Sequence, residues 1–266
     1  DVYQNEGSIK NVHLLSIMSN IGCGISFVCL ILTVMIHVCF KNLWKLMASK
    51  VLVNLCCSLA VTNLIFLISM RAFTMKIIIV CKTMAAMLHY FLLTSLMWMT
   101  VEALHVCLAL FLTLRTYQKS FMVRSSILAW GLPAVIVIIT LAINSTNNYI
   151  RIGTGCWLSK IPFYAAFLSP VVIMLIFNLT IFSIAIQQLI KMQNNKTFAH
   201  KARKVRVFGV VGLFFLLGLP WIFAFFAFDA AAEAFKFLFV TFNTLQGMFI
   251  FIFYCIYKKD TREVVS

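Results

Sequence analysis

Charge is scarce in this sequence, and negative charge is the scarcest. Only 7 of the 266 residues are Asp or Glu, against 22 Lys and Arg, and charged residues make up 11% of the chain. Soluble domains carry about 25%. No pair of acidic residues suits general acid–base chemistry, and the 5 histidines are scattered. The sequence therefore argues against a soluble domain and against an enzyme, and it predicts no catalytic site, metal site or cofactor.

Other membrane and binding classes are disfavoured by further absences. No internal repeat appears, which argues against a transporter built from paired repeats. A retinal pump needs a lysine in the middle of its last span, but the last apolar segment has only Lys236, at its outer end. Basic residues do not alternate with exposed aromatic residues, so we expect no nucleic acid partner.

Long apolar segments are what the sequence has in abundance. Hydrophobic residues make up 63% of the chain. We expect an all-α membrane protein, a seven-transmembrane helix bundle at 14–257, with an extracellular linker at 1–13 and the start of a cytoplasmic tail at 258–266. Seven segments are long enough to span a bilayer: 14–39, 50–70, 78–112, 125–146, 162–190, 205–228 and 235–257.

The positions of the basic residues predict the orientation. Fifteen Lys and Arg fall on one side of the spans and seven on the other. The richer side is expected to be cytoplasmic, which places the N-terminus outside and the C-terminus inside a multi-pass protein, surrounded by membrane lipids. The richer side comprises Lys41, Lys45, Lys50, Arg115, Lys119, Arg124, Lys191, Lys196, Lys201, Arg203, Lys204, Arg206, Lys258, Lys259 and Arg262.

Of the 9 cysteines, two are expected at the outer surface. Cys81 begins the third span and Cys156 lies in the loop between the fourth and fifth, so an oxidising compartment favours a disulfide between them. Cys39 and Cys255 lie at the inner edge beside lysines. Palmitoylation and simple packing remain equally open for these two.

Glu102 is the only acidic residue deep inside an apolar span. An ionisable side chain there is costly and is a functional candidate, with a partner expected. His105 follows three residues later on the same helical face. We expect the two to form a polar lock near the inner end of the third span, and the alternative is a static packing contact.

Bulky apolar side chains gather in the outer halves of the spans. If these faces converge, they line a deep apolar pocket beneath the loop that Cys81 holds. The ligand-binding candidates are Leu88, Leu92, Trp157, Tyr164, Trp221, Phe225 and Phe239, together with the polar Asn243. For each aromatic residue alone, lipid contact or core packing is the competing interpretation.

The sixth and seventh spans carry residues typical of a hinge and of helix contacts. Gly218 and Pro220 interrupt the sixth span below Trp221, and both residues weaken a helix there. Asn243, Gln246 and Gly247 lie within one turn of the seventh span. Amide and small residues hold membrane helices together, which is compatible with a switch.

Several motifs, taken in order, resemble the seven-helix domain of adhesion G-protein-coupled receptors. They are CW in the second outer loop, WMTVEALH in the third span, WGLPA in the fourth, LLGLPW in the sixth and FNTLQGMFIFIFYC in the seventh. Subfamily G is the most similar, by IGCGIS, NLCCSL and LHYFLL in the first three spans and by the seventh-span motif.

This resemblance implies a plasma-membrane receptor that activates a heterotrimeric G protein. A tethered peptide is the agonist in the family, and Trp157, Trp221 and Phe239 match positions that contact it. Gly218 matches the sixth-helix kink. Glu102 and His105 match the inner third-helix motif, and Asn243, Gln246 and Gly247 the seventh-helix motif. Arg115, Lys204 and Arg206 are our candidates at the rim of the G-protein cavity.

The chain departs from the family at three places. Pro220 stands where Thr is commonest, which is expected to fix the kink and to raise basal activity. Val106 and Cys107 replace the usual larger apolar residue and Tyr. The first residues, DVYQNEGSIKNVHLL, contain no cleavage signature and no hydrophobic agonist heptad. We therefore expect the agonist peptide to belong to a preceding segment.

Two alternatives remain open at this stage. The same receptor can instead be opened by a small lipid or steroid that fills the apolar pocket. From a different class, the bundle can be a non-signalling anchor that only holds an adhesive ectodomain.

Overall fold

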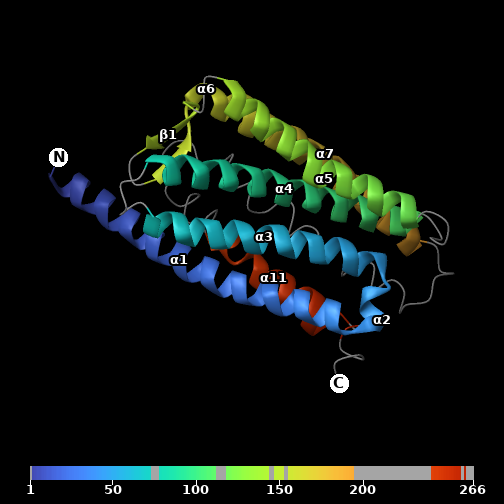
Figure 1. Cartoon of the computed structure of the whole chain (residues 1–266). Coiled ribbons are helices and arrows are strands. Elements are labelled where there is room, and N and C mark those ends of the chain that lie inside the picture. The colour runs from blue at the N-terminus through green and yellow to red at the C-terminus, as the bar shows by residue number, and fades with distance from the viewer. Residues whose placement is uncertain are drawn as a thin grey trace.

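The computed structural model shows a bundle of long apolar helices with a small β-hairpin at one end (Figure 1). It describes residues 2–72, 78–111, 118–143, 147–152, 155–194, 241–258 and 261. The helices and strands are α1 (Val2–Cys39), α2 (Lys41–Trp44), α3 (Met47–Ala72), α4 (Ile78–Phe111), α5 (Gln118–Ala142), β1 (Tyr149–Ile152), β2 (Gly155–Leu158), α6 (Lys160–Pro162), the π-helix η3 (Phe163–Leu168), α7 (Ser169–Asn194), α11 (Gln246–Phe251) and the π-helix η5 (Ile252–Tyr257).

Five helices in the described part of the chain are long and apolar enough to cross a membrane. Their apolar spans are Ser16–Cys39, Met47–Ser69, Ile78–Ala109, Ser120–Ala142 and Lys160–Gln188. They correspond to the first five predicted segments within a few residues. The sixth predicted segment, 205–228, lies outside the described residues. The seventh is described from Thr241 onward, and Gln246–Tyr257 is a shorter apolar helix.

Two local features differ from the sequence-based expectation. α1 begins at Val2, within the segment predicted as a linker, although its apolar span begins only at Ser16. The second difference is the β1–β2 hairpin, where the sequence analysis expected helices and loops only. Its strands, YIRI and GCWL, are rich in β-branched and aromatic residues, which favour extended backbone.

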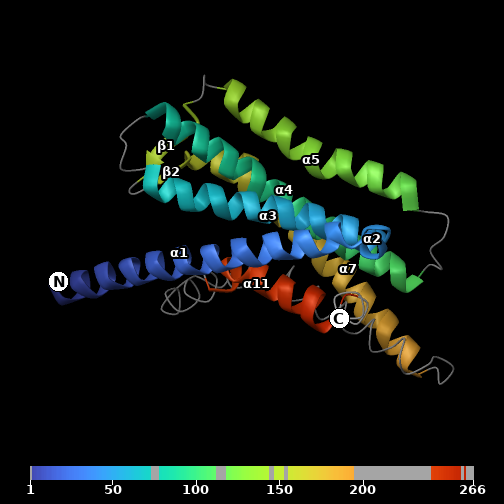
Figure 2. The ribbon, with the colours of Figure 1, turned by 60° about the horizontal axis from the view of Figure 1, so that its bottom comes forward.

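α4 lies at the centre of the described bundle. It contacts α3, α5, α7 and both strands, whereas α1 packs against α3 and α11. Figure 2 shows α1 and α11 side by side, with α5 on the far side of α4. The hairpin lies at one end of the bundle and α2 at the other (Figure 1).

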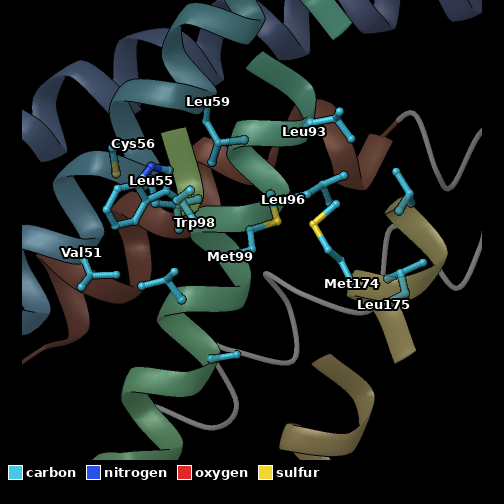
Figure 3. Close-up of a cluster of buried hydrophobic side chains, with 14 of the residues drawn as sticks. Val51, Leu55, Cys56, Leu59, Leu93, Leu96, Trp98, Met99, Met174 and Leu175 are labelled. Carbon is cyan, nitrogen blue, oxygen red and sulfur yellow. The ribbon is translucent and has the colours of Figure 1, made fainter. Parts of the chain in front are cut away.

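The core is formed where α3, α4 and α7 meet. Figure 3 shows Trp98 and Met99 of α4 among leucines of α3 and α4, with Met174 and Leu175 of α7. Trp98 is fully buried. Because lipid chains are as apolar as leucine, close packing stabilises such a core more than transfer from water does.

Candidate functional site

The β1–β2 hairpin is attached to one end of the bundle by a disulfide and by a buried histidine. The first is the disulfide between Cys81 of α4 and Cys156 of β2, as the sequence predicted. In the antiparallel register Cys156 pairs with Arg151, and Trp157 pairs with Ile150. The ring of Trp157 then packs edge-on against Phe167 of η3 at 5.3 Å. The hairpin is thus held between α4 and the start of the fifth span.

The second attachment is His89, a fully buried residue of α4. Its Nδ1 lies 3.0 Å from the Tyr149 hydroxyl of β1, and its Nε2 lies 3.1 Å from the Ala166 carbonyl of η3. Because a carbonyl only accepts, Nε2 of the neutral ring carries the proton and the Tyr149 hydroxyl donates to Nδ1. Burial raises the pKa of the Tyr149 phenol to about 12, so the hydroxyl remains a donor at neutral pH. One side chain therefore joins three elements.

Replacing His89 with Phe is expected to destabilise the protein by about 2–4 kcal/mol, because two buried partners lose their hydrogen bonds. Tyr149→Phe removes only one bond and is expected to cost about half as much. Unfolding exposes buried free thiols such as those of Cys23 and Cys56. A dye that reacts with thiols therefore follows thermal unfolding, and it measures the difference in stability between the two variants. Equal losses in both variants would show that the bond to Ala166 contributes nothing.

A small cavity with both polar and apolar lining residues lies in the middle of the bundle, among α1, α3, α4 and the last helix. Its volume is about 30 Å³, which is enough to hold water. Asn63 donates to Ser26 Oγ at 3.1 Å, and the hydroxyls of Thr62 and Ser95 lie 3.3 Å apart. The lining residues are Ser26, Leu59, Thr62, Asn63, Leu92, Ser95, Leu96, Met99, Asn243, Gln246 and Gly247.

Beside this cavity, α1 and α11 approach each other closely. The backbone N–H of Gly247 donates to Ser26 Oγ at 2.9 Å. A Cβ at Gly247 would lie 2.6 Å from Leu30 Cγ and from the Ser26 carbonyl oxygen. Likewise, a Cβ at Gly22 would lie 2.8 Å from Thr244 Cβ. Only glycine lets the two backbones approach each other this closely.

Glu102 lies further along α4, toward the end of the bundle opposite the hairpin, and is almost fully buried. Tyr254 of η5 donates a hydrogen bond of 2.9 Å to Glu102 Oε1. The Lys258 ammonium lies over the Tyr254 ring, 5.6 Å from its centre. The carboxylate that the sequence singled out is therefore bonded to the last helix, and its other oxygen has no hydrogen-bond partner among the described residues.

The hydrogen-bond donor to Glu102 is Tyr254 and not His105. The ring of His105 is half-buried and tilted against Phe121 of α5 at 6.3 Å, and its Nδ1 has no partner within the described part of the chain. The partner expected for Glu102 is thus Tyr254, and this contact joins α4 to η5. Its role as a lock stays a prediction.

The structure brings some of the predicted site residues together and leaves others apart. Leu92, Asn243, Gln246 and Gly247 line one cavity. Leu88 is half-buried on α4. Tyr164 is 54% exposed. Eight residues lie outside the described part: Arg115, Lys204, Arg206, Gly218, Pro220, Trp221, Phe225 and Phe239.

Most of the polar cavity lining was missed by the sequence analysis. Ser26, Thr62, Asn63 and Ser95 are polar residues inside otherwise apolar segments, and that contrast is the signal that could have found them. Tyr254 could have been proposed as a donor for Glu102 on the same ground. Their distances to one another are not encoded in local spacing.

One face of α4 connects all these features. His89 holds the hairpin, Leu92, Ser95 and Met99 line the cavity, and Glu102 bonds the last helix. These positions follow one another by three or four residues, which places them along one side of a helix. At 1.5 Å per residue they extend over roughly 20 Å. The arrangement can couple the hairpin end of the bundle to the opposite end, and it contains no group suited to catalysis among the described residues.

Comparison with known proteins identifies one family over most of the chain. A sequence profile described as "7 transmembrane receptor (Secretin family)" matches residues 12–250. Adhesion G-protein coupled receptor G2 of Homo sapiens is 36% identical over 262 residues, and receptor G4 of Homo sapiens is 37% identical over 260 residues. Receptor G6 of Danio rerio is 36% identical over 269 residues.

The three alignments cover the chain almost completely but cover only a small part of each relative. They include 94%, 95% and 96% of this chain, and 26%, 8% and 22% of the G2, G4 and G6 receptors. The chain thus spans about a quarter or less of the length of these curated relatives. The similarity therefore lies in the membrane-spanning part of these receptors.

Proposed function

Because this chain belongs to the secretin family of seven-transmembrane receptors and is similar to adhesion G-protein coupled receptors over nearly its whole length, we propose that it activates a heterotrimeric G protein. The family also identifies it as a multi-pass receptor rather than an enzyme. We also propose that the chain has seven spans, with its N-terminus outside and its C-terminus inside the plasma membrane. The unequal distribution of Lys and Arg supports that orientation.

The observation that carries the proposal is the continuous face of α4. Its outer part contacts the hairpin through His89, and its inner part holds Glu102 against Tyr254. A buried carboxylate whose donor comes from another helix is stable only while the two helices stay in place. The contact is therefore suited to distinguish two arrangements of the bundle.

In the proposed mechanism, an agonist at the outer end shifts the population toward an open state. It favours the arrangement in which the inner end of the sixth helix moves outward, with Gly218 and Pro220 as the hinge. Opening separates the helices that Glu102 and Tyr254 join. The Gα subunit then enters the cavity that the sixth helix opens beside the inner end of the third, with Arg115, Lys204 and Arg206 at the rim.

We further propose that the agonist is a tethered peptide from a segment preceding this chain, bound under the hairpin near Trp157 and the sixth-span Trp221. A lipid or steroid is the alternative occupant of that region. The described central cavity is itself far smaller than the roughly 300–1,000 Å³ that a drug-sized ligand fills. It is suited to water and not to either ligand.

The proposal is tested by reconstituting the chain in phospholipid nanodiscs with purified Gα subunits of the four classes, each with Gβγ. We expect guanine-nucleotide exchange above that of empty nanodiscs for at least one class, and a further rise when synthetic peptides of the preceding segment are added. Exchange at the empty-disc rate with all four classes, with and without peptide, would favour the adhesion-anchor alternative.

A further inference from the structure

The corner between the first two spans is a hydrogen-bonded turn with one buried side chain. α1 ends at Cys39, and the backbone then turns through α2. Backbone hydrogen bonds continue through the turn, from Trp44 N to Phe40 O at 3.1 Å and from Lys45 N to Lys41 O at 3.3 Å. Leu43 anchors the turn, because its side chain is only 2% exposed.

The outward side of this corner carries two lysines. Lys41 and Lys45 are both exposed and are separated by one helical turn, which places them on the same side. Like charges at this spacing destabilise a helix unless an anion lies between them. The only carboxylate side chain that the structure describes is Glu102, and it is buried inside the bundle. Within the described residues, the two lysines therefore have no acidic partner.

Exposed apolar side chains flank the two lysines. Trp44 and Leu46 are each 41% exposed at the point where the first apolar span has just ended. Tryptophan is enriched at the boundary between lipid chains and headgroups. The corner therefore presents cations at headgroup level, with an aromatic and an aliphatic side chain that can contact acyl chains. Figures 1 and 2 both place α2 at the ends of α1 and α3, at the edge of the bundle.

We propose that this corner binds a polyanionic membrane phospholipid, one whose inositol headgroup carries phosphates. Lys41 and Lys45 lie about 5–6 Å apart at their Cβ atoms, a spacing that two phosphate groups of one headgroup can bridge. Trp44 and Leu46 pack against the upper part of its acyl chains. A soluble anion would satisfy the lysines but would leave these two apolar side chains in water. The acyl chains therefore favour a membrane lipid as the occupant.

The test uses the full chain in phosphatidylcholine nanodiscs with increasing fractions of dioleoyl phosphatidylinositol bisphosphate. Native mass spectrometry counts the inositol lipids that remain bound. Each lysine near a membrane surface is worth about fivefold in binding. We therefore expect Lys41→Gln/Lys45→Gln to need roughly 25-fold more lipid for half-saturation, and Lys41→Arg/Lys45→Arg to stay within about threefold of the wild type.

The matched control is Arg124→Gln/Lys191→Gln, which removes two exposed cations elsewhere on the side that is richer in Lys and Arg. It is expected to bind like the wild type. Equal weakening in both double glutamine variants would mean that only net charge matters, and it would overturn the site, as would no weakening in either. Soluble inositol trisphosphate that binds as tightly as the lipid would overturn the membrane occupant.

Further measurements distinguish a loss of lipid binding from a loss of folding and from a loss of signalling. Thermal unfolding of each variant in pure phosphatidylcholine shows whether the glutamine variant is folded, and the arginine variant tests the same site with its charge retained. The inference requires membrane insertion but not G-protein coupling. A chain that binds the lipid and never promotes nucleotide exchange would contradict the proposed function alone.

Discussion

Replacing Gly247 with alanine is expected to destabilise the receptor by about 2–3 kcal/mol and to remove most of it from the cell surface. The new Cβ would lie 2.6 Å from both Leu30 Cγ and the Ser26 carbonyl oxygen, and it would also collide with Ser26 Oγ. One of these contacts is backbone and cannot rotate away, so α1 and α11 must separate. Overpacking of this kind costs about 1–3 kcal/mol. Separation also breaks the hydrogen bond from the Gly247 N–H.

Gly24 provides the matched control, two residues from Gly22 on the same helix. Beyond its chain neighbours and the nearby backbone of its own helix, no atom of the described residues lies within 4 Å of a Cβ built at Gly24. Gly24→Ala is therefore expected to be neutral or to stabilise by up to about 1 kcal/mol, because alanine favours the helix. Surface labelling and thermal unfolding of the solubilised protein measure both variants. If the two behave alike, the close approach of α1 and α11 is not a constraint on this protein.

Tyr254→Phe is expected to raise basal nucleotide exchange about tenfold. The change removes only the hydroxyl that donates to Glu102 Oε1. A hydrogen bond to a charged group contributes about 1.5–3 kcal/mol, and its loss leaves a buried carboxylate without this donor. In the proposed mechanism that energy holds the inner ends of the helices together, so its loss shifts the population toward the open state. GTPγS binding in nanodiscs gives the rate.

Tyr257→Phe makes the same chemical change one turn later, at a residue that is 59% exposed. It is expected to leave basal exchange unchanged. Glu102→Gln is expected to have an intermediate effect, since its carbonyl oxygen can still accept from Tyr254 but carries no charge. A decrease in basal exchange for Tyr254→Phe would place the contact in the active arrangement and would refute its role in closing the bundle.

Local sequence was sufficient for features that depend on one segment at a time. The first five spans follow from apolar length, and the disulfide follows from the outer positions of Cys81 and Cys156. Glu102 was identified as unusual because a carboxylate in an apolar span is rare whatever surrounds it.

Local sequence was insufficient where two segments meet. The spacing of three residues grouped His105 with Glu102 on one helical face, but it could not identify the donor to Glu102, which is Tyr254, 152 residues later. Local sequence could not predict the cavity either, because Asn63 and Ser26 become neighbours only when α1 and α3 pack. The hairpin was missed because its four-residue strands are too short to show a pattern among longer apolar segments.

The sequence separation of the Glu102–Tyr254 pair has a consequence for biogenesis. A ribosome adds about 5–20 residues per second. The 152 residues between the two partners therefore take roughly 8–30 s to synthesise at that rate. During that interval Glu102 has entered the translocon or the bilayer without its donor, in a surrounding where an unpaired carboxylate is costly. The hydrogen bond to Glu102 can therefore form only after the last helix has been synthesised.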